Sequence, residues 1–516
     1  MWLYGYVICF RYLFSGILKM RSINSPVIGS SMLYFVLVSI CLASCNNKII
    51  LNNTTITPLS FGAIPNDNRD DTRAFQKCVD FAIKRKIQKI FIPAGVYDIS
   101  SVNVSYGLKI FGEKGSILKK MPFSKKFDRT FTTGIRGYTY KGIKDSPLLE
   151  FKNLEFDGNF TNQGPYVNYE LEHQHSIFLM ADENFPGRLK AKIDSCYFYN
   201  GVADGVSIYK HVDAEVINCS AENVFRGAVT ITGGNSKVLI NSLVAKGDVH
   251  STGIDIEIDG ESKTHGYHTE VTAKNLWLKG DFDISGGPSG SFIGDSIYCE
   301  SAPFRVHYPG GVVRITNSTF KNLYSEQSRI IFPANVSFQD CNFHFNSDEK
   351  DKYGIEVFFN APYHKSDQGK LSFNKCTFIG ENQQPKTFTS GIFNQGDESF
   401  RNNQIIIENS VFKGKFNYPV FLDLGGNLIM ENVEFEKDYT LKFISLGKNH
   451  SYHKYNVSLK GLKTLNNKKI NIEYFDLIGN IIDIKEIEKF EFKSTNLKTS
   501  KTIIKSTGKF EKVRRQ

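Results

Sequence analysis

Short stretches of alternating apolar and polar residues recur along most of the chain. Residues 227–232 read GAVTIT and residues 253–258 read GIDIEI, so that every second side chain is apolar over much of each stretch. Successive side chains of a strand point to opposite faces, and each stretch therefore predicts a short strand with one buried face. Asn, Gly, Phe and Tyr are abundant. This composition also favours β-structure with many turns.

The alternating stretches form repeats. Units such as VINCSA, ITNSTF, FQDCNF and IENSVF resemble one another, and we number each unit by its third-last residue, the anchor. The anchors are Cys196, Cys219, Ser242, Leu276, Ser318, Cys341, Cys376, Ser410 and Val433. Four steps are 23 residues long (196 to 219, 219 to 242, 318 to 341 and 410 to 433), and three are 34 or 35 (242 to 276, 341 to 376 and 376 to 410), as if a loop had been added. FKNLEF at 151–156 fits as an earlier copy.

A period in the low twenties with several strands per unit predicts a solenoid. Leucine-rich repeats have this length, but their LxxLxL frame is missing. An asparagine often precedes the anchor, as at Asn218 and Asn317, which suits a left-handed turn residue that stacks on its equivalent in the next coil. These features predict a parallel β-helix. The anchor cysteines are then expected to be buried thiols rather than disulfides, because Ser and Val fill the same position elsewhere.

Residues 61–100 have a different pattern, FGAIPNDNRDDTRAFQKCVDFAIKRKIQKIFIPAGVYDIS. A helix is predicted at 72–84, capped by Asp70 or Asp71, with Phe75, Cys78, Val79 and Ala82 along one face. A strand, a Pro-Ala-Gly turn and a second strand follow. The pattern FGA…DDTxAFQ…IPAGxY resembles the start of the pectate-lyase superfamily, in its rhamnogalacturonase-, epimerase- and tailspike-like branch. The resemblance covers roughly residues 55–440 and implies an all-β, single-stranded, right-handed parallel β-helix with an N-terminal capping helix.

The first 45 residues resemble the signal of a bacterial lipoprotein. The apolar run 32–44 is followed by LASC, Leu42 to Cys45, and the resemblance implies that Cys45 is lipidated. A simple N-terminal membrane anchor is the alternative, but about 13 apolar residues are short for a span. Translation could start at Met1, Met20 or Met32. We expect an outer-membrane or cell-surface lipoprotein that faces the periplasm or the exterior.

The remaining chain divides into four segments. We expect a linker at 46–56, the β-helix at 57–440, terminal coils or a small capping sheet at 441–490, and a Lys-rich tail at 491–516. Removing the first 45 residues lowers the net charge from +10 to +7. Residues 485–516 carry ten Lys or Arg against four Glu, so charge is a weak argument for an acidic partner. We expect a monomer with a polysaccharide partner and no nucleic-acid partner.

A second strand recurs upstream of the anchors, in DGVSIY, GAVTIT, GIDIEID, DFDIS and PFRVH. Aligning the apolar residues stacks Val206, Val229, Ile254, Phe282 and Phe304 inside the coil. The outward positions then bring carboxylates, an arginine and a histidine within two or three coils, because rungs lie about 4.8 Å apart. The candidate catalytic residues are Asp255, Glu257, Asp259, Arg305 and His307. The candidate substrate-binding residues are Tyr209, Thr232, Lys263, His268, Asp283 and Tyr308.

The first functional hypothesis is hydrolysis of an acidic polysaccharide by a pair of carboxyls. Neighbouring acids raise one another's pKa, which keeps one protonated as a general acid. Residues i and i+2 of a strand lie about 6.5–7 Å apart, near the lower limit for an inverting glycosidase. Asp255 with Glu257 fits this spacing, and so does Glu257 with Asp259. The latter has the Glu-x-Asp form of iota-carrageenases, which are also β-helices.

Other functions stay open. A polysaccharide lyase would hold Ca²⁺ through Asp255 and Glu257, with Arg305 or Lys263 as base and His307 or His268 assisting. Chondroitinase- and alginate-lyase-like β-helices have acids, a Lys and an Arg in the same order. The polygalacturonase set NTD, DD, GHG and RxK is not found in register. A non-catalytic glycan-binding or structural β-helix would use the same face without a shifted pKa.

The same residues also allow structural interpretations. Asp259 with Gly260 can begin a turn, and Asp255 and Glu257 can form a surface charge network with Lys263 and Arg305. His173 and His175 alternate and could form a metal pair. Two histidines without a third ligand are more often surface residues, which is what we expect of them.

Overall fold

The computed structural model divides into two units, residues 1–52 and residues 53–516, and the fold described here is that of the second. The described residues are 55–135, 138–139, 147–164, 171–182, 184, 186–247, 253–258, 268–286, 290–300, 304–307, 311–323, 328–332, 335–346, 353–359, 369–381, 388–395, 403–423, 426–444, 455–475, 481–487, 490–495, 503–506 and 513–515. No helix in these ranges is long and apolar enough to cross a membrane.

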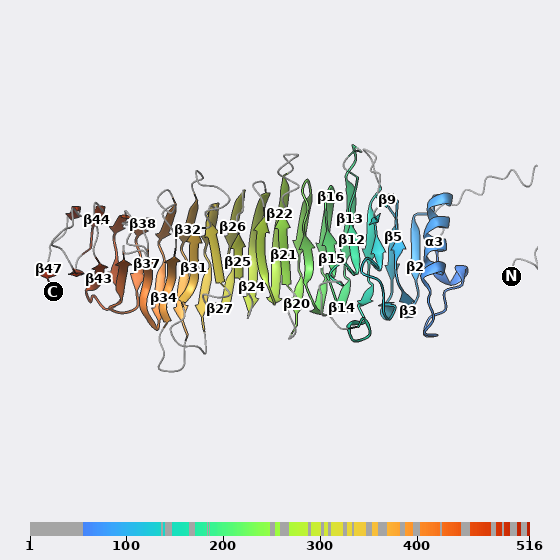
Figure 1. Ribbon diagram of the computed structural model, residues 1–516, viewed down its shortest axis with the longest axis horizontal. Coiled ribbons are helices and arrows are strands. Elements are labelled where there is room, and N and C mark those ends of the chain that lie inside the picture. Colours follow the sequence, from blue (N-terminus) through green and yellow to red (C-terminus); the bar gives the residue numbers. More distant parts are fainter. Residues whose placement is uncertain are drawn as a thin grey trace, which may run out of the picture. The chain divides into compact units, whose positions relative to one another are not determined.

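Most coils of the second unit contribute strands to three parallel ladders, A, B and C, which follow one another along the chain (Figure 1). Ladder A contains β1 Thr55–Ile56, β2 Lys89–Ile92, β5 Lys109–Gly112, β10 Leu149–Lys152, β13 Leu189–Asp194, β16 Val212–Ile217, β19 Lys237–Asn241, the first parts of β22 Thr269–Lys279 and β24 Gly290–Glu300, β26 Val312–Thr316, β29 Asn335–Gln339, β32 Lys370–Asn374, β35 Gln404–Glu408, β38 Gly426–Glu431, β41 Tyr455–Lys460, β44 Ile481–Lys485 and β46 Ile503–Ser506.

Ladder B follows ladder A in the coils up to residue 464. It contains β3 Gly95–Ile99, β6 Ser116–Lys120, β11 Glu155–Asp157, β14 Tyr197–Gly201, β17 Ser220–Val224, β20 Val244–Lys246, the last parts of β22 and β24, β27 Thr319–Leu323, β30 Asn342–Phe345, β33 Thr377–Gly380, β36 Val411–Gly414, β39 Glu434–Phe435 and β42 Lys463–Thr464. The long strands β22 and β24 run through both ladders, which makes A and B a single 29-stranded sheet.

Ladder C is a separate 16-stranded sheet. It contains β4 Val102–Asn103, β7 Phe131–Thr132, β12 Ile177–Leu179, β15 Val206–Ile208, β18 Gly227–Ile231, β21 Gly253–Ile258, β23 Phe282–Gly286, β25 Phe304–His307, β28 Ser328–Phe332, β31 Tyr353–Phe359, β34 Phe388–Gln395, β37 Phe416–Asp423, β40 Thr440–Ile444, β43 Ile470–Phe475, β45 Phe490–Thr495 and β47 Val513–Arg515. β8 Gly134–Ile135 and β9 Tyr138–Thr139 form an antiparallel pair. The predicted fold class, an all-β parallel β-helix, is confirmed.

The interior of the coils is filled by stacked apolar side chains. Phe282 and Phe304 are buried in neighbouring coils with ring centroids 5.6 Å apart, and Phe304 also contacts Phe320 at 4.8 Å. Burial of such rings is the main stabilising contribution, at about 25 cal/mol per Å² of apolar surface removed from water. The alternating apolar and polar residues of the sequence therefore form the inward and outward faces of each strand.

A helix lies at the start of the coils. α3 spans Thr72–Arg85 and buries Phe75, Cys78, Val79 and Ala82, as predicted, along with Ala74. Asp70 Oδ1 accepts a hydrogen bond from Thr72 N at 2.9 Å, while Asp71 accepts one from Ile64 N at 3.0 Å. Two short 3₁₀ helices, η2 Pro58–Phe61 and η3 Phe160–Asn162, complete the helical elements of the described residues. The helix covers core residues that would otherwise be exposed at the first coil.

A left-handed residue connects ladder A to ladder B in most coils. The residues at this turn with positive φ include Asn153, Ser195, Asn218, Ser242, Asn275, Ser296, Asn317, Asp340, Lys375, Asn409, Asn432 and Glu486. The predicted asparagine stack forms locally, since Asn432 Nδ2 donates to Asn409 Oδ1 at 3.3 Å. Asparagine suits this place because it tolerates left-handed backbone better than most residues.

Two anchors needed correction. Val244 pairs with Ser220, so Leu243 rather than Ser242 lies beside Cys219, and Ser242 is the left-handed residue. A copy at Ile297, which pairs with Leu276, was missed because DSIYCE contains no asparagine. The six described cysteines are buried free thiols, as expected.

The coils continue beyond residue 440. β41, β44 and β46 extend ladder A, and β43, β45 and β47 extend ladder C. Strands therefore occupy part of the segment for which composition predicted a Lys-rich tail. Alternation survives there, as in FEFKST of β45, and it outweighs the high lysine content.

Candidate functional site

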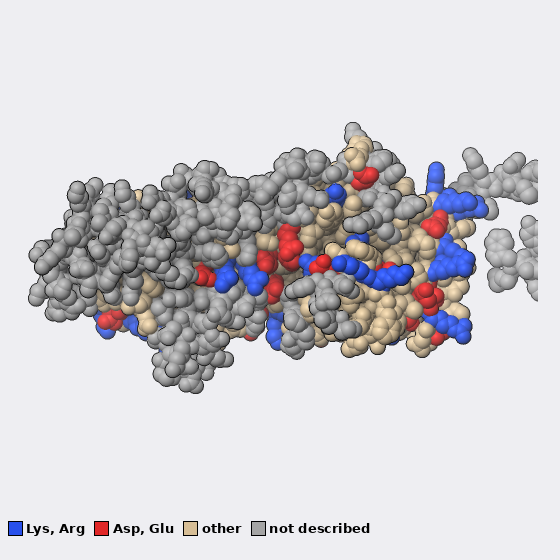
Figure 2. Space-filling view, in the orientation of Figure 1, with Lys and Arg blue, Asp and Glu red and all other residues tan. Residues whose placement is uncertain are grey.

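An outward row on ladder C carries the predicted charged residues. Val206, Val229, Ile254, Phe282 and Phe304 pair in register inside the coil, as the sequence predicted. The next residue of each strand points outward, and these residues are Phe178, Ser207, Thr230, Asp255, Asp283, Arg305, Arg329 and Glu356. We call this set the acid row. Figure 2 shows acidic side chains followed by basic ones along the middle of this face.

Asp255 and Asp283 are direct partners on adjacent strands, β21 and β23. Their side chains are only 19% and 18% exposed. Burial, followed by the charges of Glu257 and Asp283, raises the pKa of Asp255 to about 8. Burial also raises the pKa of Asp283 to about 7, although Arg305 lowers it, with Arg305 Nη1 lying 3.6 Å from Asp283 Oδ2.

The two carboxyls share one further property. Within the described part of the chain, neither Asp255 Oδ1 nor Asp283 Oδ1 accepts a hydrogen bond, although both atoms are buried. A buried carboxylate oxygen without a donor is costly, so the protonated form of each group is favoured. Asp255 and Asp283 can therefore gain and lose protons near neutral pH.

Arg226, which the sequence did not single out, connects this pair to the preceding coils. Arg226 Nη2 lies 3.8 Å from Asp255 Oδ2 and 3.7 Å from Glu257 Oε2, and Arg226 Nε lies 4.0 Å from Asp204 Oδ1. Burial alone would lower the pKa of Arg226, but the three carboxylates outweigh it and raise the pKa. Arg226 is a cation between the acids of two coils, Asp204 in the preceding coil and Asp255 with Glu257 in the following one.

Behind Arg226 lies a buried histidine and aspartate. His175 Nδ1 is 2.9 Å from Asp204 Oδ2, and both side chains are almost fully enclosed. Burial lowers the pKa of His175; burial alone would raise the pKa of Asp204, but His175 and Arg226 lower it instead. Asp204 Oδ1 also accepts a hydrogen bond from Gly227 N at 3.2 Å. The expectation that His175 is a surface residue is therefore wrong: Asp204, in the next coil, encloses it.

The second outward row contains the other predicted residues. Ile208, Ile231 and Ile256 are partners in register, so Tyr209, Thr232 and Glu257 follow one another along ladder C, and Glu257 pairs with Ser285. Tyr209 stacks against Phe178 with centroids 6.2 Å apart. Glu257 is the most exposed of the charged residues near Arg226.

An aromatic and cationic group adjoins the start of the acid row. Arg129 lies over the ring of Phe178, 3.6 Å from its centroid, and donates to the backbone oxygens of His173 and Gly134. His173 stacks on the half-exposed ring of Phe127 at 5.1 Å. Burial, followed by the charge of His175, lowers the pKa of His173 to about 4, so its imidazole is neutral at neutral pH.

Several residues predicted for the site lie away from the acid row or outside the described residues. His268 precedes β22 of ladder A, and the structure does not bring it into the acid row. Asp259, Lys263, Tyr308 and Cys45 lie outside the described residues, as does the side chain of His307. Among the described residues, no group of three or more His, Cys, Asp or Glu side chains has the arrangement of a metal site.

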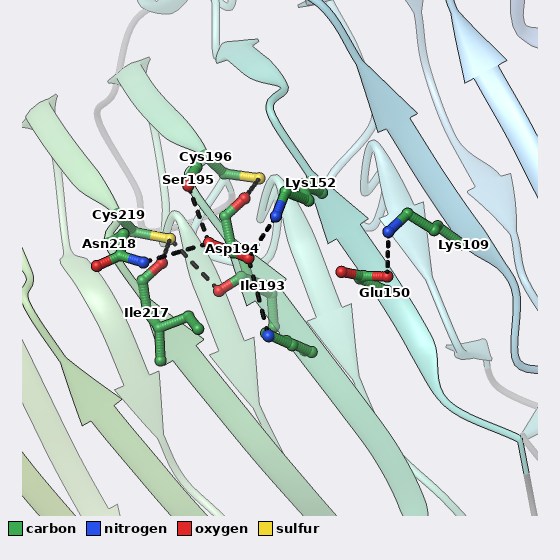
Figure 3. Close-up of polar contacts among 11 residues, drawn as sticks. Lys109, Glu150, Lys152, Ile193, Asp194, Ser195, Cys196, Ile217, Asn218 and Cys219 are labelled. Carbon is green, nitrogen blue, oxygen red and sulfur yellow. Dashed lines mark hydrogen bonds and ion pairs between the residues drawn. The ribbon is translucent and has the colours of Figure 1, made fainter.

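Asp194 on ladder A shows how a buried aspartate is accommodated when donors surround it (Figure 3). Lys152 Nζ lies 2.9 Å from Asp194 Oδ2, Ser195 Oγ donates to Asp194 Oδ1 at 2.9 Å, and Asn218 Nδ2 donates to the same atom at 3.4 Å. Burial would raise the pKa of Asp194, but these donors outweigh it and lower the pKa.

Arg226 and Asp204 were missed by the sequence for different reasons. The register of β18 and β21 shifts between Gly227 and Val229, so an extra residue separates Arg226 from the strand alignment. Asp204 was visible as the first residue of DGVSIY, and an aspartate directly before an apolar strand reads as a turn residue. One sequence signal could have indicated both residues: a charged residue stands directly before a glycine in two successive coils, as Asp204-Gly205 and then as Arg226-Gly227.

No family model matches the chain, and no curated protein matches it. The A-module of mannuronan C-5 epimerase AlgE4 from Azotobacter vinelandii is 12% identical, with a TM-score of 0.46 over 80% of this chain and 96% of that chain. The adhesin PfbA of Streptococcus pneumoniae is 13% identical, with a TM-score of 0.35 over 83% and 93%. A GH87 α-1,3-glucanase from Streptomyces thermodiastaticus is 11% identical, with a TM-score of 0.33 over 88% and 68%. These likenesses include enzymes and an adhesin, and they carry no inference about function.

Proposed function

We propose that the protein hydrolyses an acidic polysaccharide on the outer face of ladder C, with Asp255 and Asp283 as the catalytic carboxyls. The observation that carries the proposal is the pairing of these two acids on adjacent strands with pKa values of about 8 and about 7. Pairs of titratable groups whose surroundings separate their pKa values are the usual acid and base of such reactions.

The two acids take different roles. Asp255, whose pKa is about 8, holds its proton at neutral pH and donates it to the oxygen of the leaving sugar. Asp283 is stabilised as a carboxylate by Arg305 at 3.6 Å and faces the developing positive charge at the anomeric carbon. This assignment replaces the pair of Asp255 with Glu257, one of the two pairs that the sequence suggested, because Glu257 is more exposed than Asp283.

The strand register suggests the stereochemical course. Adjacent rungs are about 4.8 Å apart, close to the separation of about 5–5.5 Å between the carboxyls of retaining glycosidases. In that course Asp283 attacks the anomeric carbon as the glycosidic bond breaks and Asp255 gives up its proton. Water then cleaves the glycosyl ester, and Asp255 takes the proton from that water. We expect the product to keep the anomeric configuration of the substrate.

Arginines in the same row favour an acidic substrate. Arg305 and Arg329 are partners on adjacent strands directly beyond Asp283. Arg329 Nε donates to Glu356 Oε2 at 2.9 Å, which fixes its guanidinium while leaving the group cationic. Guanidinium groups bind carboxylate and sulfate well because their donors match the spacing of the oxygens.

A polysaccharide lyase is the second candidate, and Arg226 is the observation that favours it. Its guanidinium lies within 4 Å of both Asp255 and Glu257 and could neutralise the carboxylate of a uronate. The same arginine bears on the calcium hypothesis, since Asp255 and Glu257 could hold Ca²⁺ only by giving up their contacts with Arg226. In this alternative the neutral His173 is a candidate base.

The test is a screen of the purified protein against polygalacturonate, alginate, chondroitin sulfate and carrageenan, with neutral glycans beside them. New reducing ends without the ultraviolet absorbance of an unsaturated uronide support hydrolysis, and reducing ends with that absorbance indicate the lyase. Asp283→Asn should abolish cleavage. Asp213→Asn, an exposed acid of ladder A, is the matched control and should cleave normally. Saturable binding without any cleavage would replace the proposal with a glycan-binding protein.

A further inference from the structure

A row of aromatic residues runs along ladder B, on a different sheet wall from the acid row; Trp277 is exposed and the three tyrosines are half-buried. Tyr197, Ser220, Val244, Trp277 and Tyr298 are partners in register on successive strands. Tyr199 lies two residues after Tyr197 on the same strand, so its side chain points to the same face. We call Tyr197, Tyr199, Trp277 and Tyr298 the aromatic strip.

The rings of the strip form two ordered pairs. The rings of Trp277 and Tyr298 are nearly parallel, at 6°, with centroids 6.3 Å apart, and Trp277 is 37% exposed. Tyr197 and Tyr199 stack at 4.9 Å and 25°. Ser220 and Val244 occupy the two rungs between the pairs, and Glu222 and Lys246, two residues further along the same strands, lie beside them.

Polar groups border the rings and are already neutralised by one another. Tyr197 Oη donates to Glu222 Oε2 at 3.0 Å, and Lys246 Nζ forms an ion pair with the same carboxylate at 3.0 Å. At the other pair, Tyr298 Oη donates to Glu300 at 3.2 Å and Lys321 Nζ lies 5.3 Å from the Tyr298 ring. These groups can hydrogen-bond to a ligand, and the charges of Glu222 and Lys246 balance each other.

The chemistry of the strip suits one class of ligand. The C–H face of a pyranose ring stacks on aromatic rings, and its hydroxyls bond to mixed donors and acceptors at the edge. A charged ligand would find Glu222 already paired with Lys246 at the edge of the strip. A protein partner would require a larger apolar area than Val244 and four rings with charged borders provide.

We propose that the aromatic strip is a second carbohydrate-binding site, which holds a neutral stretch of a glycan by ring stacking. It does not depend on the proposed function, because the strip belongs to ladder B and the acid row to ladder C. The strip would keep the protein on a polysaccharide surface while ladder C remains free.

Tryptophan fluorescence gives a direct test, because the chain contains only Trp2 and Trp277. In the full chain with Trp2→Phe, Trp277 alone reports on the strip. Titration with cellohexaose, xylohexaose and mannohexaose should shift the Trp277 emission saturably for at least one of them. Tyr298→Ala should weaken that binding by about tenfold or more, which corresponds to about 1.4 kcal/mol.

Two controls make the outcome decisive. Ile293→Ala removes an exposed apolar side chain of the same strand, β24, outside the strip, and should bind normally. Asp283→Asn should leave the titration unchanged even if it abolishes cleavage. If Tyr298→Ala lowers the melting temperature, Trp277→Leu measured by affinity electrophoresis in the same glycan replaces it. No saturable shift with any of the three glycans, or loss of the shift in Asp283→Asn, overturns the proposal.

Discussion

Asp194 is buried and Asp255 is largely enclosed on the outer side of the coil, yet their surroundings move their pKa values in opposite directions. Asp194 is surrounded by Lys152, Ser195 and Asn218, whose hydrogen bonds lower its pKa. Asp255 has Asp283 on the next strand and Glu257 on its own, and its pKa rises to about 8. Burial alone would raise both.

The difference separates a structural acid from a reactive one. Donors at Asp194 hold the carboxylate in one charge state and tie together the turns of neighbouring coils (Figure 3). At Asp255 a buried oxygen lacks a donor among the described residues, so the group can change its protonation state near neutral pH. Sites of this kind cost stability and are retained where they serve a function.

The largest expected effect is on catalytic activity, which should fall in a variant of the acid pair, Asp283→Asn, and not in Asp194→Asn. Asp283→Asn removes the carboxylate that faces the reaction centre, and we expect kcat to fall by about 10³-fold or more. Asp194→Asn should keep kcat within about twofold of the wild type while the protein is folded, since Asp194 lies on ladder A. Initial rates on the best substrate of the screen measure both. Equal losses in the two variants would contradict the distinction.

The pH dependence of the rate should show the proton shared by the pair. The active form carries one proton over Asp255 and Asp283, whose pKa values are about 8 and about 7. The rate should therefore fall below about pH 7, as the second proton binds, and above about pH 8, as the last one leaves. A profile of kcat/KM against pH tests this, and a flat profile between pH 5 and 9 would rule out the pair as acid and base.

Replacing Asp255 and replacing Asp194 should change the free energy of unfolding in opposite directions, because their pKa shifts are opposite. The folded pKa of Asp255 is raised, so the folded state binds more protons than the unfolded chain between about pH 4 and 8, and the free energy of unfolding falls as pH rises. Asp255→Asn should therefore increase that free energy at pH 8, on the order of 1–3 kcal/mol. Urea unfolding at pH 5 and pH 8 measures the effect.

Asp194→Asn is the matched comparison for that experiment. The folded pKa of Asp194 is depressed, so its contribution is present above the unfolded pKa and is lost as pH falls through the folded value. We expect this variant to lose about 1–3 kcal/mol at pH 8 through the weakened hydrogen bonds of Lys152, Ser195 and Asn218. A gain in stability would show that these donors do not compensate for burial.

The smallest effect concerns Arg226. Its charge lowers the pKa of Asp255, so Arg226→Ala should move the alkaline limb of the pH profile upward and reduce kcat only modestly, by about tenfold. Arg226→Lys should restore part of the shift. Arg314→Ala, an exposed arginine of β26, serves as the control. An unchanged alkaline limb in Arg226→Ala would show that Arg226 does not act on Asp255.

The sequence by itself determined the coil. Alternation fixed which side chain of each strand is buried, and it placed Val206, Val229, Ile254, Phe282 and Phe304 in one stack, since a parallel strand with one buried face has a single register that hides its apolar residues. From that register the partnership of Asp255, Asp283 and Arg305 followed.

Only the tertiary structure decided how the charged residues divide their roles. The irregularity between Gly227 and Val229 brings Arg226 beside Asp255 and Glu257, and the approach of Asp204 encloses His175. Residue spacing does not predict the contacts of Arg226, because one extra residue in β18 changes how the residues before Val229 align with the next coil. It does not predict the contact of His175 with Asp204 either, since both lie before the strands that were aligned. The protonation of Asp255 and Asp283 depends on burial and on charges from neighbouring coils, which exist only once the coils are stacked.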